Sequence, residues 1–188
     1  MNEMSESRKK VAPIIASVVG ALLVAFLWVL VTAEPNTADD ADSPLLGQPA
    51  PSVVSTTLDD EEFVLANRKG SWVIFNFFNS TCVPCIAEHP ELVAFNEREL
   101  QASNPAEIYT VINDDNDASV RAFFAKNGGD WQKVRDTDGA ISVAFGVAKV
   151  PETWVIDPNG YVRLRIAGML TPGLLDDQLA QLKTQFGS

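Results

Sequence analysis

The chain contains two cysteines, Cys82 and Cys85, within the segment NFFNSTCVPCIAEHP. A disulfide between residues three positions apart closes almost no loop, so it would add little to the stability of a fold. The spacing is instead typical of a reactive pair that undergoes thiol–disulfide exchange. In that chemistry one thiolate attacks a disulfide of another molecule, and the second cysteine resolves the mixed disulfide that forms.

Cys82 is the expected nucleophile because it follows an apolar, strand-like segment and stands where a helix is expected to begin. Unpaired amides and the positive end of the helix dipole favour a thiolate there, so the pKa of Cys82 should fall below its ordinary value of about 8.5. Cys85, one helical turn further on, is the expected resolving cysteine. Pro84 favours a helical φ between the two.

Zinc binding is the main alternative for a CxxC pair. A zinc site would need a second CxxC or paired histidines, and the chain has one histidine, His89. Four residues after Cys85, His89 is expected at a surface position of the helix. The sequence therefore predicts no metal site and no cofactor apart from the redox-active Cys82–Cys85 disulfide itself.

A buried strand and a helix are expected on the two sides of the cysteine pair. Residues 72–78, WVIFNFF, form a near-continuous apolar run that is typical of a central strand covered on both faces. Residues 86–100 carry apolar side chains among charged ones in a pattern that suits an amphipathic helix. The reactive pair should therefore lie at the carboxyl end of a central strand.

The remaining segments alternate between strand and helix patterns. They predict strands at 52–57, 62–65, 108–112, 153–156 and 161–166, and helices at 117–126, 140–145 and 173–186. The turn sequence DPNG at 157–160 indicates that the last two strands form an antiparallel hairpin. Asp117 is the expected N-cap of its helix, and Gly128 the expected stop. The order β–β–β–α–β–α–β–β–α predicts an α/β fold with a central mixed sheet flanked by helices.

The N-terminal part has the pattern of a membrane anchor. Residues 11–33 contain no charged residue and are long enough to cross a hydrocarbon core of about 30 Å as a helix. Basic residues precede this stretch and acidic residues follow it, which predicts a cytoplasmic tail at 1–10 and a single-pass signal-anchor at 11–33. The alternative is a cleaved signal peptide, with the small residues at 31–33 near the cleavage point and a secreted product. Either interpretation exports the rest of the chain from the cytoplasm.

Residues 34–46 are polar, acidic and proline-containing, so we expect a linker there and one soluble domain at 47–188. From Ser43 onward the chain has 11 Lys and Arg residues against 19 Asp and Glu residues, a net charge of −8. Such a domain repels phosphate backbones, which argues against nucleic acid as a partner. We expect a monomer.

Two segments, VIFNFFNSTCVPCIAEHPEL and GVAKVPETWVIDPNGYVRLRIAG, resemble the thioredoxin fold, and more closely its membrane-anchored TlpA/ResA/CcmG (DsbE) branch. The resemblance covers residues 47–186. It implies a thioredoxin-like domain that reduces protein disulfides outside the cytoplasm, in cytochrome c maturation or a related thiol pathway. The implied partners are disulfide-containing proteins such as apocytochrome c, and a membrane thiol-transfer protein of the DsbD/CcdA type as electron donor.

The same resemblance gives roles to individual residues. Pro151 would be the cis-proline that faces the cysteines, and its cis bond would turn the backbone of Val150 outward to pair with an extended substrate. Glu152, directly after it, matches an acidic position of the family and would contribute to substrate binding. Glu88 matches another such position. Because Asn76 stands where thioredoxin has a buried Asp, Glu88 is the expected substitute for proton transfer or pKa tuning. For both glutamates, an ordinary solvent-facing position is the alternative.

Other functions remain open at this point. A disulfide-forming oxidase of secreted proteins would share the same cysteines and differ in reduction potential. A copper metallochaperone on this fold pairs CxxxC with a distant histidine, whereas this chain has CxxC and no histidine after residue 89. A peroxidase of the peroxiredoxin type needs TxxC, and Asn79 stands at the Thr position. Thr81 also replaces the tryptophan that the family generally has before its first cysteine, which would alter the rim contacted by partners.

Overall fold

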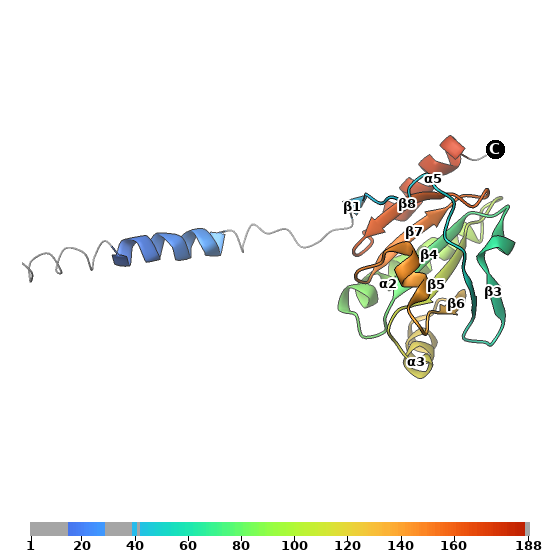
Figure 1. Cartoon of the computed structure of the whole chain (residues 1–188), viewed down its shortest axis with the longest axis horizontal. Helices are drawn as coiled ribbons and strands as arrows, with labels where there is room; N and C mark the ends of the chain where they lie inside the picture. The colour runs from blue at the N-terminus through green and yellow to red at the C-terminus, as the bar shows by residue number, and fades with distance from the viewer. Residues whose placement is uncertain (1–14, 29–38, 41, 187–188) are drawn as a thin grey trace, which may run out of the picture. The chain divides into compact units, whose positions relative to one another are not determined.

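The computed structural model describes residues 15–28, 39–40 and 42–186, which divide into two units, Met1–Pro35 and Asn36–Ser188 (Figure 1). In the first unit, residues 15–28 form a helix with exposed apolar side chains. Of the helices in these described ranges, none combines the length and hydropathy needed to span a membrane. The two ends of the expected anchor, 11–14 and 29–33, lie outside the described residues, as do the expected tail and residues 34–38 and 41 of the expected linker.

The second unit is built on a six-stranded sheet in the order β1-β8-β7-β4-β5-β6 (Figure 1). Its strands are β1 (Asp39–Asp40), β4 (Val73–Phe78), β5 (Glu107–Ile112), β6 (Gln132–Arg135), β7 (Glu152–Ile156) and β8 (Val162–Ala167). β4, β5 and β6 run parallel, whereas β7 is antiparallel to both β4 and β8. The mixed α/β sheet and the β7–β8 hairpin predicted from the sequence are confirmed.

A smaller antiparallel pair, β2 (Val54–Thr56) and β3 (Glu62–Val64), precedes the short 3₁₀ helix η1 (Leu65–Arg68). Phe63 of β3 is buried, and its ring centroid lies 4.8 Å from that of Tyr109 and 5.8 Å from that of Phe75. Because Phe75 and Tyr109 belong to β4 and β5, this pair of strands helps cover one face of the central sheet.

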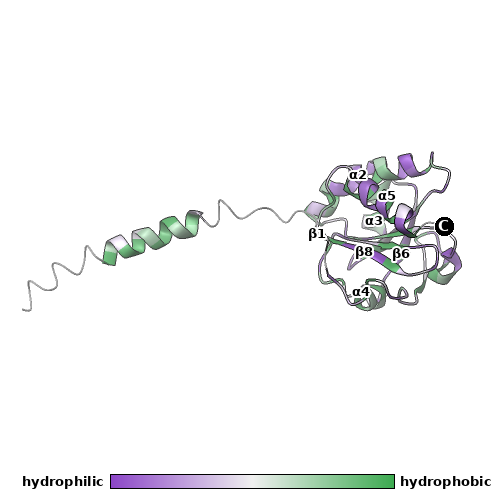
Figure 2. Ribbon diagram, turned by 90° about the horizontal axis from the view of Figure 1, so that it is seen from above, coloured by the Kyte–Doolittle hydropathy of each residue, from purple (hydrophilic) through white to green (hydrophobic). Residues whose placement is uncertain are grey.

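Helices cover the sheet from both sides. They are α2 (Val83–Glu99), α3 (Asp117–Asn127), α4 (Ala140–Phe145) and α5 (Leu174–Phe186). Figure 2 shows α2 and α5 on one side of the sheet and α4 on the other. Side chains along β4 point alternately to the two faces of the sheet. Ile74 and Phe78 pack in the core with α2, α3 and α5, whereas Phe75 and Phe77 pack with α4.

Three local features differ from the sequence-based expectations. β6 was not predicted because it is an edge strand with a single fully buried side chain, Val134, among polar residues. The N-cap of α3 is Asn116 instead of Asp117, because the Asn116 side chain accepts a hydrogen bond from the Ser119 N–H at 2.9 Å. Within the stretch expected to be a linker, Asp39–Asp40 pairs with β8 as a two-residue strand.

Candidate active site

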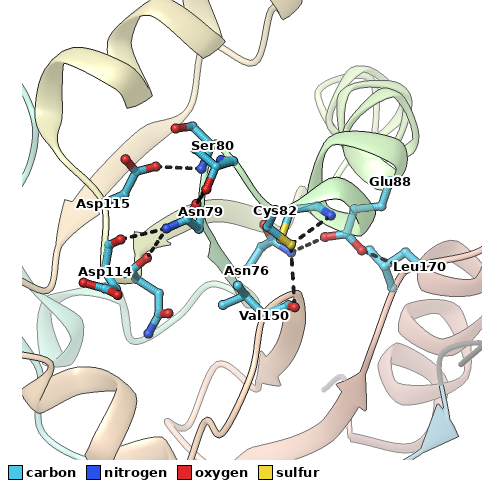
Figure 3. Close-up of a disulfide and its surroundings, with 12 residues drawn as sticks. Asn76, Asn79, Ser80, Cys82, Glu88, Asp114, Asp115, Val150 and Leu170 are labelled. Carbon is cyan, nitrogen blue, oxygen red and sulfur yellow. Dashed lines mark hydrogen bonds between the residues drawn. A yellow bond between two sulfur atoms is a disulfide. The ribbon is translucent and has the colours of Figure 1, made fainter.

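Cys82 and Cys85 form a disulfide at the junction of β4 and α2, with their Cα atoms 5.2 Å apart. Cys82 is the N-cap of α2, and its Sγ accepts a hydrogen bond from the Cys85 N–H at 3.3 Å (Figure 3). Pro84 lies in the first turn, where the amide proton it lacks would have no helical partner. The predicted position of the pair at a helix start is therefore confirmed.

The two cysteines differ in access to solvent. Cys82 is partly exposed, whereas Cys85 is fully buried beneath the first turn of α2. A partner protein can therefore approach the Cys82 sulfur but not the Cys85 sulfur. In the dithiol form, a Cys82 thiolate would accept hydrogen bonds from free amides at the start of α2, which stabilises the charged form.

The loop before β7 approaches the disulfide from the other side. The Val150–Pro151 peptide bond is cis, as the resemblance to the TlpA/ResA/CcmG branch implied. The carbonyl oxygen of Val150 lies 3.6 Å from the Cys82 Sγ (Figure 3). A disulfide sulfur has no proton to donate, so this carbonyl becomes a hydrogen-bond acceptor for Cys82 only in the dithiol form. The structure thus brings Val150 and Pro151 to the cysteine pair.

Glu88 lies inside the protein on the same face of α2 as Cys85, three residues further along. Its side chain is 1% exposed, and its carboxylate accepts hydrogen bonds from the Asn76 Nδ2 and from the Leu170 N–H, each at 2.8 Å (Figure 3). Burial raises the pKa of Glu88 to about 7, and the two hydrogen bonds only partly oppose this effect. A carboxyl group with this pKa can both accept and release a proton near neutral pH.

Asn76 connects Glu88 to the centre of the sheet. It lies on β4 opposite Thr153 of β7, and its Nδ2 also donates to the Thr153 Oγ1 at 3.2 Å. The Asn76 Oδ1 is buried and has no hydrogen-bond partner within the described parts of the chain. Asn76 therefore orients the Glu88 carboxylate as a neutral donor, whereas an aspartate at this position would place a second negative charge beside it.

Glu152 does not face the solvent beside the cysteines. Its side chain is 1% exposed and forms a two-point ion pair with Arg165, with Nε–Oε1 and Nη2–Oε2 distances of 2.9 and 3.0 Å. The Trp154 Nε1 also donates to its Oε1 at 2.7 Å. Both oxygens are thus used inside the fold, so we assign Glu152 a structural role in place of the expected contact with substrate.

The prediction that His89 occupies a surface position is wrong. His89 is 2% exposed and packs among the rings of Phe78, Phe123, Phe124 and Trp131. Its Nε2 lies 3.0 Å from the carbonyl oxygen of Gly128 and so carries the donated proton, while its Nδ1 is buried without a partner among the described residues. The pattern of apolar and polar residues in this helix did not predict the burial of His89, because histidine counts as a polar residue in such a pattern.

Burial lowers the pKa of His89, so acid is expected to destabilise the fold through this residue. As the pH falls below the ordinary value of 6.5, the unfolded chain binds a proton that the folded chain resists. As the pH is lowered from 7 to 5, the thermal midpoint of the wild type should therefore drop relative to that of His89→Phe, which keeps every other titratable group. The chain has no other histidine, so parallel curves for the two proteins would contradict this assignment.

Side chains that no sequence pattern had indicated hold the loop before Cys82. The Nδ2 of Asn79 donates to the carbonyl oxygens of Asn113 and Asp114, and the Asp115 Oδ2 accepts from the Ser80 N–H at 2.6 Å (Figure 3). Both segments directly follow strands, β4 and β5, which are parallel neighbours. Parallel neighbours end at the same edge of a sheet, so the polar residues after each strand were the signal that could have revealed these contacts.

Comparison with known proteins agrees with this geometry. Residues 46–165 match the AhpC/TSA family. The thiol:disulfide interchange protein DsbE of Pseudomonas aeruginosa is 28% identical over 171 residues, which cover 89% of this chain and 88% of the relative. The interchange protein HelX of Rhodobacter capsulatus is 32% identical over 152 residues, covering 79% of this chain and 81% of HelX.

A solved structure supports the fold. The thioredoxin domain of a thiol-disulfide oxidoreductase from Bacteroides vulgatus superimposes with a TM-score of 0.65 at 20% identity, covering 74% of this chain and 99% of that domain. At this identity the likeness shows the thioredoxin-like fold. Together with the family match and the relatives above, it shows that the chain belongs to the thioredoxin-like AhpC/TSA family and to its group of DsbE- and HelX-like proteins.

Proposed function

We propose that this chain is an extracytoplasmic thiol–disulfide oxidoreductase that reduces disulfides of partner proteins. The observation that carries the proposal is the unequal access of the two sulfurs, with Cys82 partly exposed at the N-cap of α2 and Cys85 buried one turn further on. This arrangement suits an attacking and a resolving cysteine. It needs no bound cofactor, because the cysteine pair itself stores the two electrons.

The reaction begins with the dithiol form. The Cys82 thiolate attacks one sulfur of the partner's disulfide, which forms a Cys82–partner disulfide and releases the other partner sulfur as a thiolate. Cys85 then loses its proton and attacks the Cys82 Sγ, which releases the second partner sulfur. The partner gains two electrons and two protons, and the chain is left with the Cys82–Cys85 disulfide that the structure contains.

Glu88 is the proposed acceptor of the Cys85 proton. Both side chains are buried on one face of α2, where bulk water has little access. The raised pKa of Glu88, about 7, lets the carboxylate take up the proton during resolution and release it afterwards. Asn76 and the Leu170 N–H hold the carboxylate in place for this transfer.

The proposed substrate is a disulfide in an extended protein segment such as that of apocytochrome c, with a membrane thiol-transfer protein of the DsbD/CcdA type as electron donor. The names of DsbE and HelX as thiol:disulfide interchange proteins support the activity. Val150 supports the extended geometry, since its backbone lies against Cys82 and precedes the cis bond. We propose that the domain acts as a monomer.

We also propose that residues 11–33 anchor the protein in the cell membrane, with residues 1–10 in the cytoplasm and the catalytic domain outside. Support comes from the absence of charged residues in 11–33, the basic residues before them, and the exposed apolar side chains of the helix at 15–28.

Trapping with Cys85→Ser tests the proposed function. Without the resolving thiol, Cys82 should remain bound to its partners as mixed disulfides that survive non-reducing electrophoresis and can be identified by mass spectrometry. Recovery of an apocytochrome or of a membrane thiol-transfer protein would support the pathway. The Cys82→Ser/Cys85→Ser double variant is the control, and equal capture by both proteins would refute the role of Cys82.

The reduction potential separates a reductase from an oxidase. A value near that of thioredoxin, about −270 mV, is expected for a reductant of protein disulfides. A value close to the DsbA range, about −120 mV, would instead make the chain an oxidant of secreted proteins. Equilibration with glutathione buffers, followed by alkylation of the free thiols, gives this potential.

A further inference from the structure

The carboxamide of Asn79 uses all of its hydrogen-bonding capacity. Its Nδ2 donates to the carbonyl oxygens of Asn113 and Asp114, at 3.1 and 2.7 Å. Its Oδ1 accepts from the N–H and the hydroxyl of Thr81, at 2.9 and 2.7 Å. A carboxamide offers two donated protons and two acceptor positions, so no capacity is left over.

These contacts explain the residue types at both positions. An aspartate at position 79 could accept from Thr81 but could not donate to the two carbonyls, and an alanine could do neither. The hydroxyl of Thr81 supplies one of the two bonds to the Oδ1, which a residue without a short side-chain donor could not supply. Asn79 and Thr81 therefore form a matched pair, which we call the Asn79–Thr81 pair.

The Asn79–Thr81 pair lies in the loop that leads directly into the nucleophile. The Cys82 N–H donates to the Asn79 carbonyl oxygen at 3.1 Å, so residues 79–82 form a turn. The Asn79 side chain stabilises this turn through its hydrogen bonds with Thr81. The same side chain ties this turn to the loop after β5, where Asp114 has a φ of 46°. The bond from the Ser80 N–H to the Asp115 Oδ2 ties the two segments together a second time (Figure 3).

Orientation of this turn matters for the chemistry. Cys82 holds an extended backbone conformation, with φ −73° and ψ 112°, while the next residue is already helical. In this conformation the Cys82 Sγ faces the amides of the first turn, and it accepts a hydrogen bond from the Cys85 N–H. Rotation of the backbone at residues 81–82 would move the sulfur away from the groups that stabilise a thiolate.

We propose that Asn79, paired with Thr81, is a positioning residue that keeps the Cys82 sulfur directed at the start of α2 and so maintains its thiolate. The proposal rests on the proposed function of Cys82 as nucleophile. It assigns Asn79 no contact with the substrate.

The test is the pH dependence of Cys82 alkylation in the reduced full-length protein, followed by mass spectrometry. In Asn79→Ala the midpoint should rise by about one pH unit, which corresponds to a tenfold smaller thiolate fraction below the midpoint. Thr81→Val should move the midpoint in the same direction by less. Because the two residues share one interaction, the double variant should move it no further than Asn79→Ala alone.

Asn127 offers a matched control. Its Nδ2 donates to the Phe123 carbonyl oxygen at 2.8 Å in α3, a bond of the same kind that does not involve the cysteine loop. Asn127→Ala should therefore leave the alkylation midpoint of Cys82 at its wild-type value. A shift as large as that of Asn79→Ala would show that the midpoint merely follows general destabilisation, and would overturn the proposal.

Comparison of the thermal midpoint with the alkylation midpoint distinguishes a positioning role of Asn79 from a purely structural one. If Asn79→Ala lowers the thermal midpoint but leaves the alkylation midpoint unchanged, the proposal is wrong. If Asn79→Ala does not fold, Thr81→Val decides, and a wild-type alkylation midpoint in that variant overturns the proposal. A wild type that cannot reduce protein disulfides, while its alkylation midpoint still depends on Asn79, would reject the proposed function and leave the positioning role standing.

Discussion

Cys82→Ser is expected to lower the rate of protein disulfide reduction by on the order of 10³-fold or more, because the hydroxyl that replaces the thiol does not ionise near neutral pH. Cys85 cannot substitute for it, since this residue is fully buried and a partner's disulfide cannot reach its sulfur. The measurement is the rate at which the dithiol form reduces a protein disulfide under single-turnover conditions.

Cys85→Ser is the matched control for this loss. It removes the same internal disulfide but leaves the exposed sulfur in place, so the first attack and the mixed disulfide should persist while product release is lost. If Cys82→Ser kept a rate comparable to the wild type, Cys85 would have to be the attacking cysteine. The burial of Cys85 would then not describe the reduced protein.

Glu88→Gln is expected to remove a large pH dependence of stability. Folded Glu88 keeps its proton up to about pH 7, whereas the unfolded chain releases it near the ordinary value of 4.5. The contribution of Glu88 to the free energy of unfolding should therefore fall as the pH rises from 4.5 through 7, by about 3 kcal/mol in all. Glutamine has no proton to lose, so the variant should lack this decrease.

The measurement is urea unfolding of the oxidised protein at several pH values between 4 and 8, for wild type and variant. The difference between the two curves isolates Glu88, because both proteins contain the same His89 and the same other carboxylates. Glu97→Gln is a suitable control, since Glu97 lies on the same helix and is exposed. Curves for wild type and Glu88→Gln that run parallel would refute the raised pKa.

Glu88→Gln should also slow the second step of the reaction more than the first. The variant keeps a carbonyl acceptor on its side chain but cannot take up the Cys85 proton. In single-turnover experiments, the mixed disulfide with Cys82 is therefore expected to accumulate in the variant more than in the wild type.

Local sequence patterns were sufficient to predict the mixed α/β sheet and the reactive cysteine pair. The apolar run at 72–78, the turn DPNG and the helical patterns are each defined by residues that are close together in the sequence, so local pattern is enough to predict them. The spacing of Cys82 and Cys85 and their position at an expected helix start were enough to predict a redox-active pair. The cis bond at Pro151 came from resemblance to a family, and the structure confirms it.

The surroundings of the two cysteines could be learned only from the folded chain. Nothing in the local pattern indicates that Glu88 is buried against Leu170, that Glu152 pairs with Arg165, or that His89 lies among aromatic rings. Each outcome depends on residues that are distant in sequence, and a polar side chain on a helix or strand is compatible with either burial or exposure. Burial and pairing then set the charge of these groups, and the chemistry of the site depends on that charge.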